Sequence, residues 1–325
     1  GYAATALEPL WGFRHRKRAN AIFGLMFGYG KIDYMRFVGS VREIAGYDGD
    51  IVLSTSPEEK MKPGVAEYLK KHRVLSYAFG YTCKKKGARR RNLLATPAGC
   101  VLTDWYEKGE TRGPRPLALI RYEQYKSWLA AYSKESWILI MDTRDSFFQR
   151  DPFSPPVLNK ADGTDLHLFA ENRDVKWIAN CPFNSGWLGC WGRDVVKKHG
   201  NGSVVCSGST LGHRDAADTY TSLMIAEFDK QQCHVTRGTE SDQGYHNYLY
   251  HTGKMAAAGL NVKRNAQGTG VVNTVGAMNG YRVPAHKKGP LGTFWKARDA
   301  EGWVINWDGT RSAVVHQWDR FAPEM

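Results

Sequence analysis

The sequence predicts an α/β protein with a mixed, mostly parallel sheet flanked by helices. Short apolar runs alternate with segments of helical spacing across residues 21–75, which is the pattern of β-α-β units. A further apolar run, residues 137–141, leaves no room for polar alternation and so predicts a strand buried on both faces. The chain has 325 residues, 42% of them hydrophobic and 24% charged, which is enough for one large domain with a sizeable core.

The elements follow in order along the chain. Apolar runs and glycine or polar breaks predict strands at 21–28, 50–54, from 74, 137–141, 166–170, 186–189, 303–307 and 313–316. Helical spacing predicts helices at 31–46, 58–72, 117–132, 215–230 and 241–251. In the helix at 117–132, the apolar residues fall on one face. Residues 265–293 are rich in Gly and Asn and give no clear prediction.

One domain accounts for most of the chain. Residues 1–20 form a basic lead-in, and residues 21–325 form a single domain with a C-terminal lobe, because no linker composition appears. Residues 84–115 break the α/β pattern and read as a basic excursion from the sheet. Four of the eleven tryptophans lie in the last 31 residues, where they belong either to the core or to a surface that stacks on sugars.

The charge balance indicates an anionic partner. There are 45 Lys and Arg against 32 Asp and Glu, a net charge of +13, which suits nucleic acid, nucleotide, a membrane surface or an acidic glycan. The run 84–91 holds six Lys or Arg in eight residues. It lacks interleaved aromatic residues and no nucleic-acid-binding motif accompanies it, so nucleic acid is disfavoured. A solvated loop and a binding segment for an anionic glycan acceptor both stay open.

Several features concern the compartment. No apolar run of about 18 residues is present, so the sequence predicts no helix that spans a bilayer. The chain begins at Gly1 without Met, which leaves room for an N-terminal membrane anchor removed from this sequence. Six cysteines without C-x-x-C spacing argue against structural zinc and allow three disulfides, and Asn201 begins a glycosylation sequon. These features favour the secretory pathway, and a cytosolic protein with six thiols is the alternative.

Two acids follow the buried strand at 137–141. Ligands of open α/β sheets bind beyond the carboxyl ends of the strands. Asp142 and Asp145 lie there, three residues apart, and can share one hard divalent cation such as Mg²⁺ or Mn²⁺. A polar strand end, with Asp145 capping the next turn, explains the same residues without a metal.

The segment 138–153 resembles the metal-binding strand of GT-A nucleotide-sugar glycosyltransferases. Its order of apolar strand, paired aspartates, apolar residues and Asp-Pro is similar to that of the glycogenin-like and the plant cell-wall arabinosyl- and xylosyltransferase families. The sequence departs from their Asp-x-Asp by one residue. Counted back from Asp151, Asp145 matches the metal-bound aspartate, and Asp142 matches either a metal ligand or a contact to the nucleotide ribose.

Three further pieces recur in the order found in those families. The resemblance implies that Asn184, with Ser185 and Gly186, contacts the donor sugar. It implies that Asp242 and Gln243 are catalytic residues beside that sugar, and that His316 completes the metal site. Each piece has a structural alternative: an Asn turn before glycine, a helix N-cap at Ser241, and a core histidine.

Other residues fit donor binding by their positions. Phe27, Gly28 and Tyr29 lie where the similar families hold the nucleotide base, which suits an aromatic stacking group and a close backbone approach. Thr143 and Arg144 lie between the two aspartates. Arg121, on the helix before the metal strand, either reaches the sugar or diphosphate or pairs with a surface acid.

The resemblance implies a transferase that uses Mn²⁺ or Mg²⁺. Such an enzyme moves a sugar from a nucleotide-diphosphate donor, first of all a UDP-sugar, to a glycan or glycoprotein acceptor, with retention of configuration and in the Golgi lumen. Asp242 would lie nearest the anomeric carbon, or would be the general base if the configuration inverts. Two alternatives stay open: an inactive carbohydrate-binding protein of the same fold, and a nucleotidyltransferase on a similar sheet.

Overall fold

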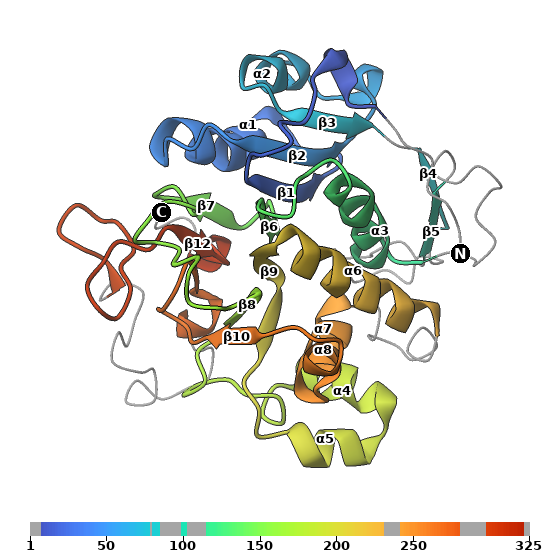
Figure 1. Ribbon diagram of the computed structural model, residues 1–325, viewed down its shortest axis with the longest axis vertical. Helices are drawn as coiled ribbons and strands as arrows, with labels where there is room; N and C mark the ends of the chain where they lie inside the picture. Colours follow the sequence, from blue (N-terminus) through green and yellow to red (C-terminus); the bar gives the residue numbers. More distant parts are fainter. Residues whose placement is uncertain are drawn as a thin grey trace.

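The architecture is a seven-stranded sheet between two layers of helices (Figure 1). The computed structural model describes residues 8–78, 80–84, 99–102, 115–230, 241–279 and 297–321. Strand β9 runs antiparallel to its neighbours β6 and β8, and the other strands of this sheet run parallel to one another. The predicted fold class, a mixed and mostly parallel α/β sheet flanked by helices, is confirmed. In spatial order the strands are β10 (Val262–Asn265), β8 (Leu166–Ala170), β9 (Val205–His213), β6 (Trp137–Met141), β1 (Ala21–Met26), β2 (Asp50–Thr55) and β3 (Leu75–Ala78).

Helices cover both faces of the sheet because its strands are apolar on both sides. Phe23 of β1 packs with Tyr125 of the helix layer on one face, and the adjacent Ile22 packs with Phe37 on the other. The helices are α1 (Lys31–Tyr34), continued by a π-helical segment (Met35–Ile44), α2 (Val65–Lys71), α3 (Leu117–Leu129), α4 (Pro182–Leu188), α5 (Arg193–His199), α6 (Arg214–Asp229), α7 (Asp242–His251) and α8 (Lys254–Ala257).

A small second sheet returns the C-terminal part of the chain to the central strands. Its order is β11 (Val272–Thr274), β12 (Val314–His316) and β7 (Ser146–Phe148). Strand β7 begins four residues after Asp142, and its register pairs Ser146 with His316. This pairing brings a residue near the end of the chain to the loop that follows β6.

Three sequence predictions are wrong in detail. The strand predicted at 186–189 is the end of helix α4, in which Pro182 occupies the first turn, where its missing N–H costs nothing. The strand predicted at 303–307 forms only isolated bridges, at Val304 and Ile305. The single helix predicted at 58–72 is a 3-10 turn followed by α2, because Pro63 and Gly64 interrupt it. Strand β9 was not predicted at all.

Much of the predicted basic excursion lies outside the described residues, including most of the run 84–91. Within that region the backbone of β4 (Tyr81–Lys84) pairs antiparallel with β5 (Gly99–Leu102). Residues 280–296, which include the second half of the segment 265–293 without a prediction, lie outside as well. None of the helices in the described ranges is both long and apolar enough to cross a membrane.

The cysteines do not all pair. Cys190 is disulfide-bonded, whereas Cys181 and Cys206 are free, buried thiols. Three disulfides are therefore not formed, although the even count allowed them.

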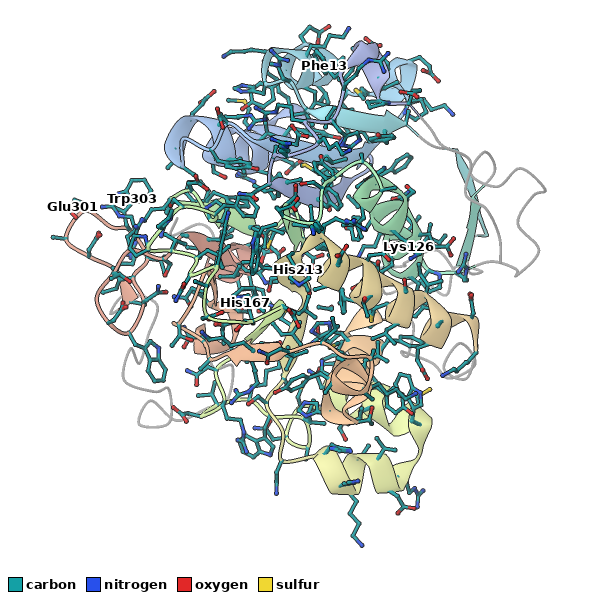
Figure 2. The ribbon with its side chains drawn as sticks, viewed as in Figure 1. Phe13, Lys126, His167, His213, Glu301 and Trp303 are labelled. Atoms are coloured by element: carbon teal, nitrogen blue, oxygen red, sulfur yellow. The ribbon has the colours of Figure 1, made fainter. Side chains whose placement is uncertain are left out.

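The C-terminal tryptophans divide between core and surface. Trp318 is buried, and Trp307 is exposed. Trp303 is half-buried on a protruding loop beside Glu301, where the Arg311 guanidinium lies 4.6 Å from its ring centre (Figure 2). The core expectation therefore holds for Trp318, and a tryptophan surface that stacks on sugars stays a prediction.

Candidate metal and donor site

The loop after β6 is fixed on both sides by neighbouring strands. The backbone N–H of Asp142 donates to the carbonyl of Gly208 in β9 (2.7 Å), and Thr143 Oγ1 donates to the carbonyl of Leu25 in β1 (2.7 Å). Both bonds hold the start of the loop at the carboxyl end of the parallel strands. The predicted site therefore lies at the edge of the sheet where α/β proteins bind ligands.

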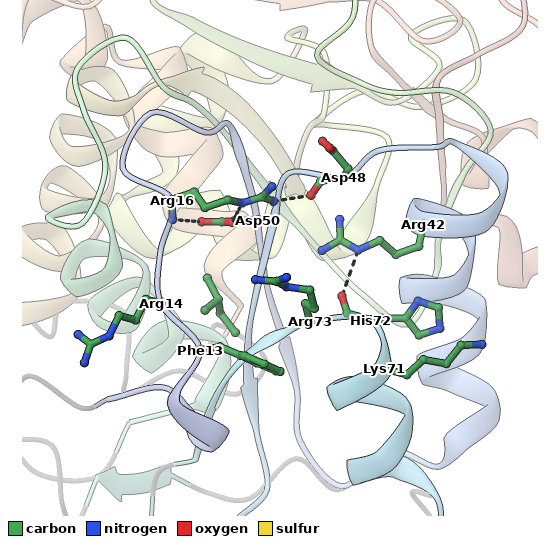
Figure 3. A pocket seen from close by; sticks show the side chains of 10 residues that line it. Phe13, Arg14, Arg16, Arg42, Asp48, Asp50, Lys71, His72 and Arg73 are labelled. Atoms are coloured by element: carbon green, nitrogen blue, oxygen red, sulfur yellow. Dashed lines mark hydrogen bonds and ion pairs between the residues drawn. The ribbon is translucent and has the colours of Figure 1, made fainter.

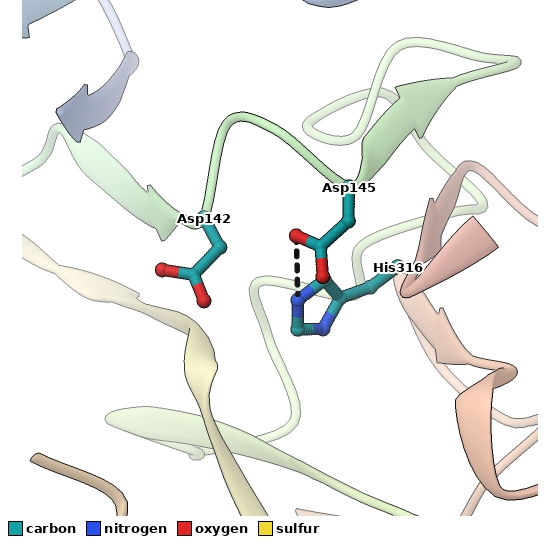
Figure 4. Close-up of side chains that lie close together, drawn as sticks. All are labelled: Asp142, Asp145 and His316. Atoms are coloured by element: carbon teal, nitrogen blue, oxygen red, sulfur yellow. Dashed lines mark ion pairs between the residues drawn. The ribbon is translucent and has the colours of Figure 1, made fainter. Parts of the chain in front are cut away.

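Three potential metal ligands converge at this loop. One ligand atom each from Asp142, Asp145 and His316 lies within 4.8 Å of the others (Figure 4). His316 Nε2 lies 3.5 Å from Asp145 Oδ1, and the N–H of Gln317 donates to the Asp145 carbonyl (2.7 Å). The sequence prediction of Asp142, Asp145 and His316 as one cluster agrees with this geometry.

The shape of the site fits an ion with oxygen and nitrogen ligands. Gly208 faces the side chains of Asp142 and His316, and a Cβ on it would lie 2.5 Å from Asp142 Oδ2 and 2.8 Å from His316 Nε2. Only glycine leaves this space free. Two carboxylates and an imidazole suit a divalent metal cation.

The electrostatics of the cluster favour an ion pair between Asp145 and His316. Burial by itself would raise the pKa of Asp145, but the charges of His316, Arg144 and Arg320 outweigh it and lower that pKa. Burial would likewise lower the pKa of His316, and Cys206 and Asp145 raise it instead. A cation that binds here would replace the proton on His316.

A buried arginine joins the metal cluster to Asp242, the carboxylate that the sequence predicts to be catalytic. Arg121 of α3 forms ion pairs with Asp142 through Nη1 and with Asp242 through Nη2. Tyr122 Oη donates a further hydrogen bond to Asp242 Oδ2 (3.1 Å). Arg121 therefore pairs with acids, as one alternative expected, but with acids of the site and not of the surface.

Gln243 and Asn184 connect α4 and α7 to strand β9. Gln243 Oε1 accepts from the N–H of Ser207 (2.7 Å), and its Nε2 donates to the carbonyl of Val205 (3.0 Å) and to Asn184 Oδ1 (3.3 Å). Asn247 makes a matching pair of bonds with the N–H and carbonyl of Val205 (3.0 and 2.8 Å). The amide of Gln243 is thus occupied by protein contacts that position the start of α7 and Asp242.

The predicted base-binding segment lies beside the metal cluster. Gly28 has φ 77°, a conformation that favours glycine, and its N–H donates to Ser56 Oγ (3.2 Å). Burial raises the pKa of Tyr29, and the charges of Arg144, Asp142 and Asp145 act on the same hydroxyl. Tyr29 is therefore close to the cluster. Phe27, two residues before Tyr29, is half-buried.

Other predicted residues lie at the margin of the site. Arg144 is exposed and pairs with Asp319 (3.1 Å). Ser185 is half-buried and Gly186 exposed on α4. Ser241 caps α7 by accepting from the N–H of Gln243 (3.2 Å), as the structural alternative proposed. Asn201 is exposed in the loop after α5.

Sequence reasoning missed the residues of β9. Cys206 Sγ lies 3.7 Å from His316 Nδ1, on the side of the ring away from Asp145, and Gln317 Nε2 donates to the same sulfur (3.5 Å). Gly208 was missed too. The signal available was the Ser-Gly-Ser stretch 207–209, whose small residues suit a close approach by other groups.

Comparison with known proteins gives structural likenesses but no matching sequence family. No protein-family model matches the chain, and no curated protein matches it. Among solved structures, the chain is similar to the apo structure of the bifunctional glycosyltransferase WbbM, with 9% identity and a TM-score of 0.48. The match covers 96% of this chain and 47% of that one, so the chain spans about half the length of that protein.

Proposed function

We propose that this protein is a metal-dependent glycosyltransferase that moves a sugar from a nucleotide-diphosphate donor to a glycan or glycoprotein acceptor. One observation carries the proposal: Arg121 joins Asp142 of the candidate metal cluster to Asp242, the predicted catalytic carboxylate. A transferase of this kind needs a cation at the diphosphate and a carboxylate at the sugar, held at a fixed separation.

Asp142, Asp145 and His316 would hold Mn²⁺ or Mg²⁺. The bound ion supplies positive charge that neutralises the departing diphosphate. UDP is the first candidate for the nucleotide, with Tyr29 and Phe27 beside the base. These assignments of base and metal rest on the family resemblance together with the donor set of the cluster.

The protein's own residues would position the sugar. Asp242 is buried and held by Arg121 and Tyr122, so its carboxylate has one orientation. Its charge would stabilise an oxocarbenium-like transition state, and retention of configuration is the proposed outcome. Gln243 and Asn184, bonded to each other, fix the α7 start and the α4 segment that flank this carboxylate.

The proposed compartment is the secretory lumen. The disulfide at Cys190 and the exposed sequon at Asn201 support it, because both features suit an oxidising compartment with glycosylation.

A thermal-shift titration tests the proposal. Ligands of the native state raise the melting temperature by mass action, so UDP together with Mn²⁺ should raise it by more than the two separate shifts added. Asp145→Asn should abolish this joint shift, whereas Asp194→Asn, the same charge change at an exposed position on α5, should leave it intact. An equal UDP shift in EDTA would contradict the metal assignment.

Turnover separates the transferase from an inactive relative. Asp242→Asn should keep the joint UDP and Mn²⁺ shift but reduce transfer to acceptor, and hydrolysis of a UDP-sugar, by about 100-fold or more. Full binding without turnover of any nucleotide sugar by the unmodified protein would support the carbohydrate-binding alternative. Release of pyrophosphate from a nucleoside triphosphate would support the nucleotidyltransferase.

A further inference from the structure

A cavity of about 540 Å³ lies at the opposite edge of the sheet from the metal cluster, where β2 and β3 begin (Figure 3). The six residues of β2 separate the two edges, which at about 3.3 Å per residue is a distance of about 17 Å. The cavity is therefore a separate feature from the donor site. Its lining residues are Phe13, Arg14, Arg16, Arg42, Asp48, Asp50, Lys71, His72, Arg73 and Leu75.

Five cationic side chains and two carboxylates line this cavity. Asp50 is already satisfied, because it accepts from the side chain and the N–H of Arg16 (2.8 and 2.9 Å) and from Tyr132 Oη (2.9 Å). Arg42 donates to the backbone carbonyls of Tyr47 and Gly49 (2.8 and 2.7 Å). Carbonyl groups leave the guanidinium charge uncompensated.

The remaining cations have no ion pair within the described ranges of the chain. These are Arg14, before β1, Lys71, the last residue of α2, and Arg73, two residues after it. All three are exposed at the cavity, so their charges are available to a ligand from solvent. The cavity thus keeps an excess of positive charge that its own carboxylates do not neutralise.

Arg73 is held in an unfavourable backbone conformation. Its φ is 51°, in the left-handed region, at the position after a helix where glycine is the usual residue. Figure 3 shows its guanidinium pointing into the cavity. Strained residues of this kind concentrate at binding sites, where the side chain has a use that offsets the strain.

We propose that this cavity binds an acidic glycan through its sulfate or carboxylate groups. Guanidinium groups bind such planar or tetrahedral oxyanions with paired hydrogen bonds. The cations come from two separate segments, 14 and 71–73, which suits several charges spaced along a chain better than a single compact diphosphate. The half-buried ring of Phe13 offers an apolar surface for the face of a sugar.

The choice of a glycan rests on the proposed function, in which a glycan is the acceptor. The site would hold a distant, acidic part of that acceptor while another part reaches the metal edge. Binding here needs neither metal nor nucleotide, so it can be measured independently of the donor site.

Isothermal titration in EDTA without nucleotide tests the proposal. A heparin-derived tetrasaccharide and a tetragalacturonate should bind, and binding should weaken as salt rises; maltotetraose, which is neutral, should not bind. Arg14→Ser/Arg73→Gly should weaken binding at least tenfold. Lys197→Ser/Lys198→Ser removes two exposed charges on the distant helix α5 and should change it less than twofold.

Arg73→Gly alone keeps the test independent of folding. Glycine relieves the positive φ, so this variant should melt at the same or a higher temperature while it binds the acidic tetrasaccharides more weakly. Its joint UDP and Mn²⁺ shift should match that of the unmodified protein, which separates failure here from failure of the donor site. If both double variants weakened binding of the acidic tetrasaccharides equally, binding would depend only on the net charge of the protein, and the proposal would be overturned. Saturable binding of inorganic phosphate that displaces both tetrasaccharides would overturn the glycan and indicate a phosphate site.

Discussion

Strands β6 and β9 are hydrogen-bonded neighbours in the middle of the sheet, and both are buried. Their residues differ, however: those of β6 are large and apolar, and many of those of β9 are small or polar. Strand β6 reads Trp-Ile-Leu-Ile-Met and fills the core on both faces. Strand β9 reads Val-Cys-Ser-Gly-Ser-Thr-Leu-Gly-His. Its small residues leave space, and its backbone binds the loops that carry the site.

The difference separates two tasks. The side chains of β6 stabilise the fold, and the backbone and glycines of β9 shape the site. The Gly208 carbonyl holds Asp142, and the Ser207 N–H and Val205 carbonyl hold Gln243. Substitutions in β9 near the metal cluster should therefore affect ligand binding more than stability. Substitutions in β6 should affect stability more than ligand binding.

The largest effect is expected from Gly208→Ala. The added methyl would lie 2.5 Å from Asp142 Oδ2 and 2.6 Å from His316 Cε1, so it must separate the metal ligands. We expect the joint UDP and Mn²⁺ shift to disappear and transfer activity to fall by about 100-fold or more. Ser209→Ala, the control on the same strand, removes a hydroxyl without a hydrogen-bond partner among the described residues and should leave both unchanged. Normal Mn²⁺ binding by Gly208→Ala would contradict the close approach.

Leu139→Ala is the matching change in β6. Leu139 is fully buried, and removing its side chain should lower the free energy of unfolding by about 3 kcal/mol. Urea denaturation measures this loss. The folded fraction should still show the joint shift, because Leu139 lies in the apolar core cluster and not at the strand end. If folded Leu139→Ala lost the joint UDP and Mn²⁺ shift, β6 would shape the binding site as β9 does, and the proposed difference between the two strands would be wrong.

The contrast also explains how far the sequence predicts the fold. Strands β1, β2 and β6 are apolar runs, and their burial on both faces follows from composition alone. Strand β9 has the composition of a loop, because Ser and Gly are weak strand formers. It is a strand because β6 and β8 pair with it on both sides, which no local pattern reveals.

The candidate site divides in the same way. Asp142, Asp145 and His316 were found because short motifs mark them. The pairing of Arg121 with Asp242 joins residues 121 positions apart, and the contact of Cys206 with His316 joins residues 110 positions apart. Such contacts depend on how helices and strands pack, and a single sequence does not encode them in its spacing. Asn184 precedes the strand predicted at 186–189 and lies instead on helix α4, yet it still reaches Gln243.

Asn247→Ala tests a side chain that serves the backbone of β9. Its amide satisfies both the N–H and the carbonyl of Val205 inside the protein. Alanine would remove the side-chain acceptor of the Val205 N–H, whereas the Val205 carbonyl keeps its bond from Gln243 Nε2. The lost acceptor should lower the free energy of unfolding by about 2 kcal/mol. Urea denaturation gives the value, and Asn247→Asp, which can still accept from the N–H, should lose less at a pH where its carboxyl is protonated. A neutral effect of alanine would show that β9 needs no such support.

The smallest effect concerns pH and the helix that covers β9. His246 of α7 is buried, and its Nδ1 bonds to Tyr220 Oη (2.7 Å). Burial, with smaller contributions from the charges of His251 and Arg121, lowers the pKa of His246 to about 3. An unfolded histidine titrates near pH 6.5, so the unfolded state binds the proton first and stability falls as pH drops below that value. Between pH 6.5 and 5.5 the histidine should contribute a loss of about 1 kcal/mol, and below pH 5.5 the slope should approach about 1.4 kcal/mol per pH unit.

Urea denaturation at several pH values measures this slope in the unmodified protein and in His246→Gln. The variant keeps a polar group beside Tyr220 but cannot titrate, so its stability should fall less steeply with acid, whatever its stability at pH 7.5. Parallel slopes for the two proteins would mean that His246 takes up its proton in the folded state. The side of β9 that faces α7 would then be accessible to water, unlike the apolar surroundings of β6, and the two strands would differ in solvation as well as in composition.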